Sequence, residues 1–222
     1  LERFPLLPLP DKAANIRPLR SPSQKKANQL QHQSATNFSD YVTSLKVKIH
    51  FEFLGNDNIQ RALQLLHKTN QFNLNKTFFT KKILLTAHQN LGQVIVIKLE
   101  DILLPLETMG VIIIKQDPKH LKECFIDNFV LSCRALGKKA EDAIITLVLN
   151  HLKTRNINIV KGVITPTDKN FVAQSLYLNN GFTCYSKKAH STYWHKKLTR
   201  KLTPLKSATY INNLDKENLY ES

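Results

Sequence analysis

The residues best suited to chemistry lie in a turn between a predicted strand and a predicted helix. Residues 124–133 are rich in β-branched and apolar side chains, as is typical of a buried strand. From Ala140 onward the apolar positions follow helical spacing. A helix start presents unpaired N–H groups and the positive end of its dipole, which suits an anion such as a pyrophosphate. The turn residues that would contribute are Arg134, Gly137, Lys138 and Lys139.

A second pair of candidates lies further along the chain, on a helix predicted over residues 168–180. Asn170 and Tyr177 are seven residues apart, which is two helical turns, so both can face one cleft. A phenol is a hydrogen-bond donor near neutral pH, as a proton donor must be. A tyrosine packed in a core is the alternative interpretation, and it also needs a partner for its hydroxyl. The turn from Arg134 to Gly137, with the spacing R-x-x-G, likewise has an alternative interpretation: an ordinary turn that binds no ligand.

A general base and a nucleophile are less clearly indicated. Strand alternation places Glu123 and Asp127 on one face together with Phe125 and Phe129, which favours partial burial and a raised carboxyl pKa. Solvation at a strand edge is the alternative, and neither carboxylate is assigned. Cys133 has no histidine partner evident in the sequence, so core packing is the interpretation favoured for it.

The elements around these residues predict the α/β (α+β) class, with a mixed, mainly antiparallel sheet flanked by helices. Short connections favour antiparallel neighbours, whereas the helix after Gly137 makes a crossover to a parallel strand. Before residue 168, helices are predicted over residues 58–68 and 81–85 and from residue 140. Strands are predicted at residues 45–53, 94–99, 111–115, 124–133, 157–164, 182–187 and 191–196.

The composition indicates a globular chain in a reducing compartment. Of the 222 residues 42% are hydrophobic, no apolar run approaches 18 residues, and three cysteines show neither disulfide nor zinc spacing. A cytoplasmic setting without a membrane is therefore expected. The proline-rich residues 1–38 are interpreted as a linker from a preceding domain, 39–200 as the folded domain and 201–222 as a polar tail. The start at Leu1 fits a fragment of a longer protein.

The net charge of +15 favours a partner that carries negative charge. Nucleic acid is one such partner, but the lysines are scattered and not interleaved with stacking aromatics. The prediction is therefore a phosphate-bearing or acidic partner and no nucleic acid.

The turn resembles the acyl-CoA loop of the GNAT acyltransferases, whose pattern is Q/R-x-x-G-x-G/A. Arg134 and Gly137 match it, while Lys139 departs from its last position. The runs SCRALGKKAEDA, TNQFNLN and PTDKNFVAQSLYLNNGF also resemble the C-terminal domain of FkbH-like proteins, over about residues 27–194. In that family a HAD-like domain precedes a GNAT-like domain and loads a glyceryl unit onto an acyl carrier protein. The Asp-x-Asp motif of the HAD-like part does not occur in this chain.

The resemblance implies an acyltransferase that uses acetyl-CoA, another acyl-CoA or a carrier-protein phosphopantetheine. A wedge between splayed strands would hold the thioester. Tyr177 would protonate the leaving thiolate, and Asn170 would contact the pantetheine or phosphate arm. An acyl carrier protein and a preceding HAD-like domain are the implied partners. A non-catalytic module that docks the carrier protein is the alternative. The implied cofactor-binding residues are Phe129, Leu131, Arg134, Leu136, Gly137, Lys138, Lys139, Ala140, Asn170 and Tyr177.

Overall fold

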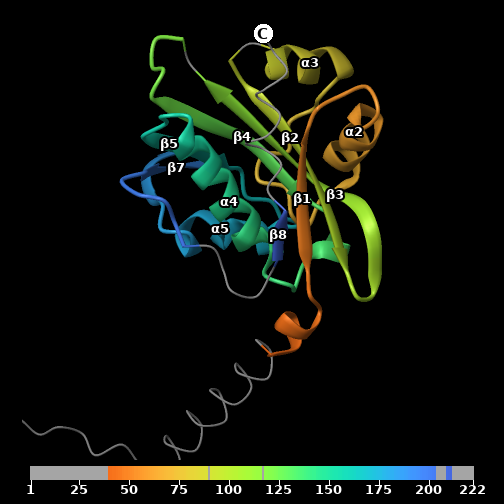
Figure 1. Cartoon of the computed structure of the whole chain (residues 1–222). Coiled ribbons are helices and arrows are strands. Elements are labelled where there is room, and N and C mark those ends of the chain that lie inside the picture. Colours follow the sequence, from red (N-terminus) through yellow and green to blue (C-terminus); the bar gives the residue numbers. More distant parts are fainter. Residues whose placement is uncertain (1–39, 90, 117, 204–208, 212–222) are drawn as a thin grey trace, which may run out of the picture. The chain divides into compact units, whose positions relative to one another are not determined.

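The structure is a computed structural model that describes residues 40–89, 91–116, 118–203 and 209–211. The strands in these residues form one sheet in the order β6-β7-β5-β4-β3-β2-β1-β8 (Figure 1). The predicted mixed sheet is confirmed, and each predicted strand overlaps an observed one. The strands are β1 (Lys48–Phe53), β2 (Gln93–Asp101), β3 (Leu104–Gln116), β4 (Glu123–Leu131), β5 (Ile159–Ile164), β6 (Thr183–Lys188), β7 (Ser191–Lys197) and β8 (Thr209–Ile211).

Parallel pairing occurs at two places in the described sheet. β4 and β5 are parallel and pair from Glu123 opposite Ile159 to Ile126 opposite Gly162, as the predicted crossover requires. β1 and β8 are also parallel. β8 was not predicted, because it lies in the segment interpreted as a polar tail. The predicted linker, residues 1–38, lies outside the described residues and stays a prediction.

Helices cover the two faces of the sheet and create two apolar cores. The helices α2 (Ile59–Lys68) and α3 (Lys81–Gln89) pack on one face, and α4 (Ala140–Thr154) and α5 (Leu176–Asn179) pack on the other (Figure 1). The helix predicted over residues 168–180 is instead a 3₁₀ helix, η2 (Phe171–Ser175), followed by the short α5. No helix in the described part of the chain is both long and apolar enough to span a membrane.

A β-bulge in β4 corrects the predicted alternation. Asn128 lies opposite Ile113, and Ile126 lies opposite Ile114, so Asp127 is an extra residue in the strand. The bulge reverses the facing of the residues that follow it. Phe129 and Leu131 therefore face the α4 and α5 core, as Ile126 does. Phe129 does not share the face of Phe125, contrary to the prediction from simple alternation.

Candidate functional site

β4 and β5 part beyond their last paired residues, and the space between their ends, where the wedge was predicted, is here called the cleft. Their last paired residues are Ile126 and Gly162, but β4 continues to Leu131 and β5 to Ile164. The end of β4 leads directly through the 3₁₀ helix η1 (Cys133–Ala135) and a turn to α4. The parting of the two strands and the start of α4, which the resemblance implies belong to one site, are therefore contiguous in the fold.

A segment between α2 and α3 fills this cleft. Residues Phe72–Asn75, here called the strap, run antiparallel to β4 with Asn73 opposite Val130. Three backbone hydrogen bonds hold the strap to the two strands. Leu131 N–H donates to the Phe72 carbonyl at 3.0 Å, Leu74 N–H donates to the Phe129 carbonyl at 3.2 Å, and Thr165 N–H donates to the Leu74 carbonyl at 2.8 Å. The strap thus behaves as a short additional strand between β4 and the end of β5.

Side-chain amides reinforce the same junction. Asn75 N–H donates to Asn128 Oδ1 at 3.0 Å, and Asn75 Nδ2 donates to the Asp127 carbonyl at 3.2 Å. Asn170 is 1% exposed, and its Nδ2 donates both to the Asn73 carbonyl at 2.8 Å and to the Thr165 carbonyl at 3.0 Å. Asn170 therefore links the strap to the loop after β5. Both its Nδ2 and its Oδ1 form hydrogen bonds within the protein.

The strap is anchored by two apolar side chains. Phe72 and Leu74 are both 0% exposed, and Phe72 meets Phe129 edge-on with ring centroids 5.0 Å apart. Burying a side chain of this size contributes roughly 1.5–3 kcal/mol, whereas a typical backbone hydrogen bond contributes a net of roughly 0.5–1.5 kcal/mol. The two anchors therefore contribute at least about as much as the three backbone bonds together.

The amide network around the strap is incomplete. Asn73 Oδ1 and Asn128 Nδ2 are buried and have no hydrogen-bond partner in the described structure. Each such group costs about 1–3 kcal/mol relative to its solvated state. Apolar burial and hydrogen bonds therefore hold the strap against the cost of one unpaired group in the strap and one in β4.

Tyr177 lies beside the point where the strands part, but it is fully enclosed. It is 0% exposed, and its ring packs on Phe182 at 4.7 Å between centroids. Its hydroxyl has no hydrogen-bond partner in the described structure. Burial, with smaller contributions from the charges of Cys124 and Asp127, raises the pKa of the phenol well above its usual value. The phenol is thus protonated at neutral pH, and its catalytic role stays a prediction.

The turn before α4 has the backbone that an anion cradle requires. Gly137 has φ of +77°, Lys139 has φ of +53°, and α4 begins at Ala140. The first turn-to-helix hydrogen bond runs from Ala143 N–H to the Lys139 carbonyl, so the preceding N–H groups at the helix start lie outside the helical ladder. A β-carbon placed on Gly137 would meet no atom of the described residues within 4 Å. The turn is open to a ligand on that side.

The predicted cations of the turn are largely committed elsewhere. Arg134 forms an ion pair with Glu107 of β3, and Lys138 forms one with Asp101 of β2, whose side chain is 0% exposed. Among the three predicted cations, Lys139 makes no ion pair within the described part of the chain. The positive charge available to an anion at this turn is therefore smaller than the sequence indicates.

The buried Asp101 carboxylate stays ionised in spite of its environment. Burial opposes ionisation, but Lys138 and the N–H groups of Leu103 and Leu104 outweigh it and hold the pKa of Asp101 below its usual value. This pair connects the β2–β3 hairpin to the turn before α4. The ion pair indicates a structural role for Lys138 and Asp101, because their charged groups are directed at each other and not at a ligand.

The two halves of the predicted site fit the implied ligand unequally. The turn before α4 fits a phosphate, since its backbone is open and precedes a 15-residue helix. The wedge does not fit a pantetheine arm in this conformation, because the strap already bonds the edge of β4 at Phe129 and Leu131. The site assignments therefore remain predictions. Binding of an arm between β4 and β5 requires a conformation in which the strap has left the edge of β4.

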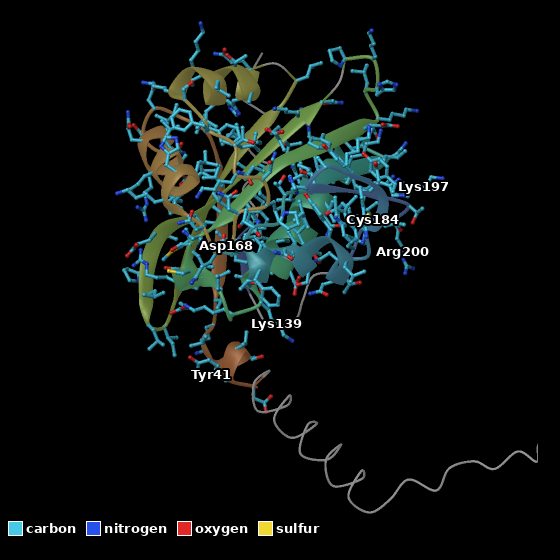
Figure 2. The ribbon with its side chains drawn as sticks, turned by 180° about the vertical axis from the view of Figure 1, so that it is seen from behind. Tyr41, Lys139, Asp168, Cys184, Lys197 and Arg200 are labelled. Atoms are coloured by element: carbon cyan, nitrogen blue, oxygen red, sulfur yellow. The ribbon has the colours of Figure 1, made fainter. Side chains whose placement is uncertain are left out.

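A polar pocket of about 180 Å³ lies beside the strap. Its walls come from the strap region and from the loop after β5, and Asp168 in that loop is marked in Figure 2. Asn73 is 1% exposed, and its Nδ2 donates to the Thr69 carbonyl at 3.1 Å. The pocket is lined by Asn70, Asn73, Lys76, Thr167, Asp168, Lys169 and Asn170.

The two carboxylates considered as general bases are both paired with lysines. Glu123 forms an ion pair with Lys161, and Asp127 forms one with Lys115 at 2.8 Å. The Asp127 side chain is 14% exposed. Each carboxylate is therefore engaged by a lysine of a neighbouring strand, Lys161 of β5 or Lys115 of β3.

The comparisons identify the fold. The ribosomal-protein-S18-alanine N-acetyltransferase from Escherichia coli superposes with a TM-score of 0.54 and 10% identity, over 68% of this chain and 95% of that one. Spermidine N-acetyltransferase from Vibrio cholerae, in complex with CoA and spermine, gives 0.53 and 14%, over 70% and 98%. The GNAT domain of S. lividans PAT gives 0.52 and 9%, over 67% and 89%.

The protein therefore has the GNAT fold. At these identities the likeness shows the fold alone. No family model and no curated protein matches the sequence.

Sequence reasoning missed the strap. No strand was predicted at residues 70–75, four of which are asparagine or glutamine. The signal that could have revealed the strap is the alternation of Phe72 and Leu74 with asparagines, since a period of two is typical of a strand. The strap is only four residues long, too short for this alternation to predict a strand.

Proposed function

We propose that this domain binds the phosphopantetheine thioester of an acyl-CoA or of a carrier protein and transfers the acyl group to an acceptor. The observation that supports this most is the β4–turn–α4 unit of a GNAT fold, with its open glycine turn beside the parting of β4 and β5. In this proposal residues 136–140 bind the phosphate. Phe129 and Leu131 bind the arm through their backbone groups, and Tyr177 supplies a protonated phenol.

The resemblance to FkbH-like proteins motivates the carrier-protein form of this proposal. A carrier protein delivers the same arm as CoA but has one phosphate at its base, so the turn before α4 would bind a single phosphate. A HAD-like domain would then be the neighbour that shares the carrier protein.

A second candidate function is non-catalytic docking of a carrier protein. Two specific observations favour it: the strap fills the wedge, and Tyr177 is 0% exposed. The two functions differ in turnover. A docking module would bind the holo carrier protein without releasing free thiol from an acyl thioester in the presence of amine acceptors.

Variants of Gly137 test both functions. Because its φ is +77°, Gly137→Val adds bulk and also strains the turn, whereas Gly137→Asn adds a side chain that tolerates this conformation. Calorimetry with CoA and with holo carrier protein should show a loss of at least about tenfold in affinity for Gly137→Val, since charge-assisted bonds contribute roughly 1.5–3 kcal/mol each. Binding with turnover supports the transferase, and binding without turnover supports the docking module. Absence of binding by the folded parent would contradict both.

A further inference from the structure

We propose that the strap and the thioester arm are alternative occupants of the same cleft, so that ligand binding requires the strap to leave. This inference rests on the proposed function. It goes further by identifying the residues that control entry, Phe72 and Leu74, and by defining the chemical pattern that a ligand must present to replace them.

The pattern follows from the backbone groups that the strap satisfies. Leu131 N–H and Thr165 N–H each need an acceptor, and the Phe129 carbonyl needs a donor. The strap supplies a carbonyl, an N–H and a second carbonyl in sequence along an extended chain. A linear arm with two amide groups provides the same set, which is the chemistry shared by the pantetheine of CoA and that of a carrier protein.

The strap is built as the tip of a loop whose base is fixed. At the base, His67 Nε2 and the Phe79 carbonyl are 2.7 Å apart, across 12 residues. Phe79 is 1% exposed and belongs to the core under α2 and α3. The tip can therefore leave the cleft while both helices stay in place.

The contacts at the tip are balanced rather than uniformly favourable. Phe72 and Leu74 gain from burial, while Asn73 Oδ1 and Asn128 Nδ2 are buried without partners. Release of the tip frees the Asn73 amide from its buried position and exposes the two apolar side chains. An arm that takes over the backbone bonds must compensate for exposing these two anchors and for the amide bonds of Asn75 and Asn170 to the strap junction. Truncating an anchor lowers this cost and is therefore expected to favour the ligand.

A reversible lock provides the first test. Asn73 and Val130 lie opposite each other, and the hydrogen bonds on either side of them mark a non-hydrogen-bonded pair, in which Cα atoms are roughly 4.5 Å apart. That spacing admits a disulfide. The double variant Asn73→Cys/Val130→Cys is compared when oxidised and when reduced, by calorimetry with CoA and with holo carrier protein. The parent under the same two conditions controls for Cys133, which is exposed.

Opening the strap provides the second test. Phe72→Ala removes one anchor, and binding of CoA should tighten by roughly tenfold, because burial of the ring no longer opposes entry. Leu74→Ala tests the second anchor and serves where Phe72→Ala fails to fold, as judged by circular dichroism and thermal melting. Holo carrier protein, tested beside CoA, distinguishes the two sources of the arm.

The outcomes separate the strap from the function. Loss of binding in the oxidised lock, recovered on reduction, together with tighter binding after truncation, supports the proposal. Equal binding by the oxidised lock, the reduced lock and the parent overturns it and leaves the proposed function intact. Absence of binding by the parent, the reduced lock and both truncations overturns the strap proposal together with the proposed function.

Discussion

The Tyr177 hydroxyl occupies the space that a side chain at Gly162 would need. A β-carbon built on Gly162 would be 2.2 Å from Oη and 2.5 Å from the ring carbon that bears it. The backbone of β5 is thus approached by a rigid ring at the residue where pairing with β4 ends. A side chain at position 162 and the tyrosine at position 177 cannot both be accommodated unless α5 or β5 moves.

Gly162→Ala is therefore expected to destabilise the fold by about 1–3 kcal/mol, the usual cost of overpacking. Tyr177→Phe removes the hydroxyl and should restore part of this loss, so a double-mutant cycle from urea unfolding should show coupling. Gly55→Ala is the matched control, because a β-carbon on Gly55 meets nothing within 4 Å. Additive effects of Gly162→Ala and Tyr177→Phe would contradict the contact.

Cys124 predicts a loss of stability at alkaline pH. Burial raises the pKa of its thiol from 9.0 to about 12. The unfolded chain then ionises above about pH 9 while the folded chain does not, so stability is full below pH 9 and falls as the pH rises. Cys124→Ala removes this dependence. The difference in unfolding free energy between parent and variant should shift by about 1.4 kcal/mol between pH 7.5 and pH 10.

The check is urea unfolding of parent and variant at both pH values. Cys133→Ala, at an exposed position, provides the comparison, since that thiol is solvated in both the folded and the unfolded chain. A parent-to-variant difference for Cys124→Ala that stays the same at both pH values would rule out this origin of the alkaline loss.

The ion pair between Lys138 and Asp101 predicts asymmetric effects of substitution. Lys138→Met removes the charged partner of the buried carboxylate, which keeps the N–H donors of Leu103 and Leu104, and should cost up to about 3 kcal/mol. Asp101→Asn combined with Lys138→Met should cost less than the single change. The lowered pKa of Asp101 means that its contribution is present above about pH 4 and is lost as the pH falls further. Thermal melting at pH 7 and pH 3 measures both effects. A Lys138→Met penalty of equal size at both values would show that the charge is not responsible.

Glu141 predicts a stabilising substitution at the start of α4. Its Oε2 is buried without a partner, and burial raises the pKa of the carboxyl. Its cost is absent below the unfolded pKa near 4.5 and grows as the pH rises through the folded value. Glu141→Gln should therefore stabilise the protein by roughly 1 kcal/mol at pH 7 and have little effect at pH 4. Asp142→Asn is the control and should not stabilise, because that carboxylate accepts from Asn180 Nδ2 at 2.7 Å. Melting temperatures across this range test the difference.

Much of the fold followed from local patterns, and the site did not. The crossover from β4 to β5 was predictable because the strand, the turn and the helix each have a clear periodicity. The bulge at Asp127 was not, since one extra residue leaves the apolar pattern of a strand almost unchanged. The burial of Asn170 was also hidden, because it depends on the Asn73 carbonyl, 97 residues away in the chain. The ion pairs of Arg134 and Lys138 depend on β2 and β3 in the same way.

The strap also has a consequence for self-association. An uncovered strand edge offers a row of N–H and carbonyl groups on which another chain can build a β-sheet. In this fold the inner edge of β4 would be such a template if the strap were absent, and its neighbouring side chains are apolar. The strap shields that edge, so a chain with an open cleft is expected to form oligomers at lower concentration than the parent. When a ligand arm leaves the cleft, the strap returns and covers the edge of β4 again.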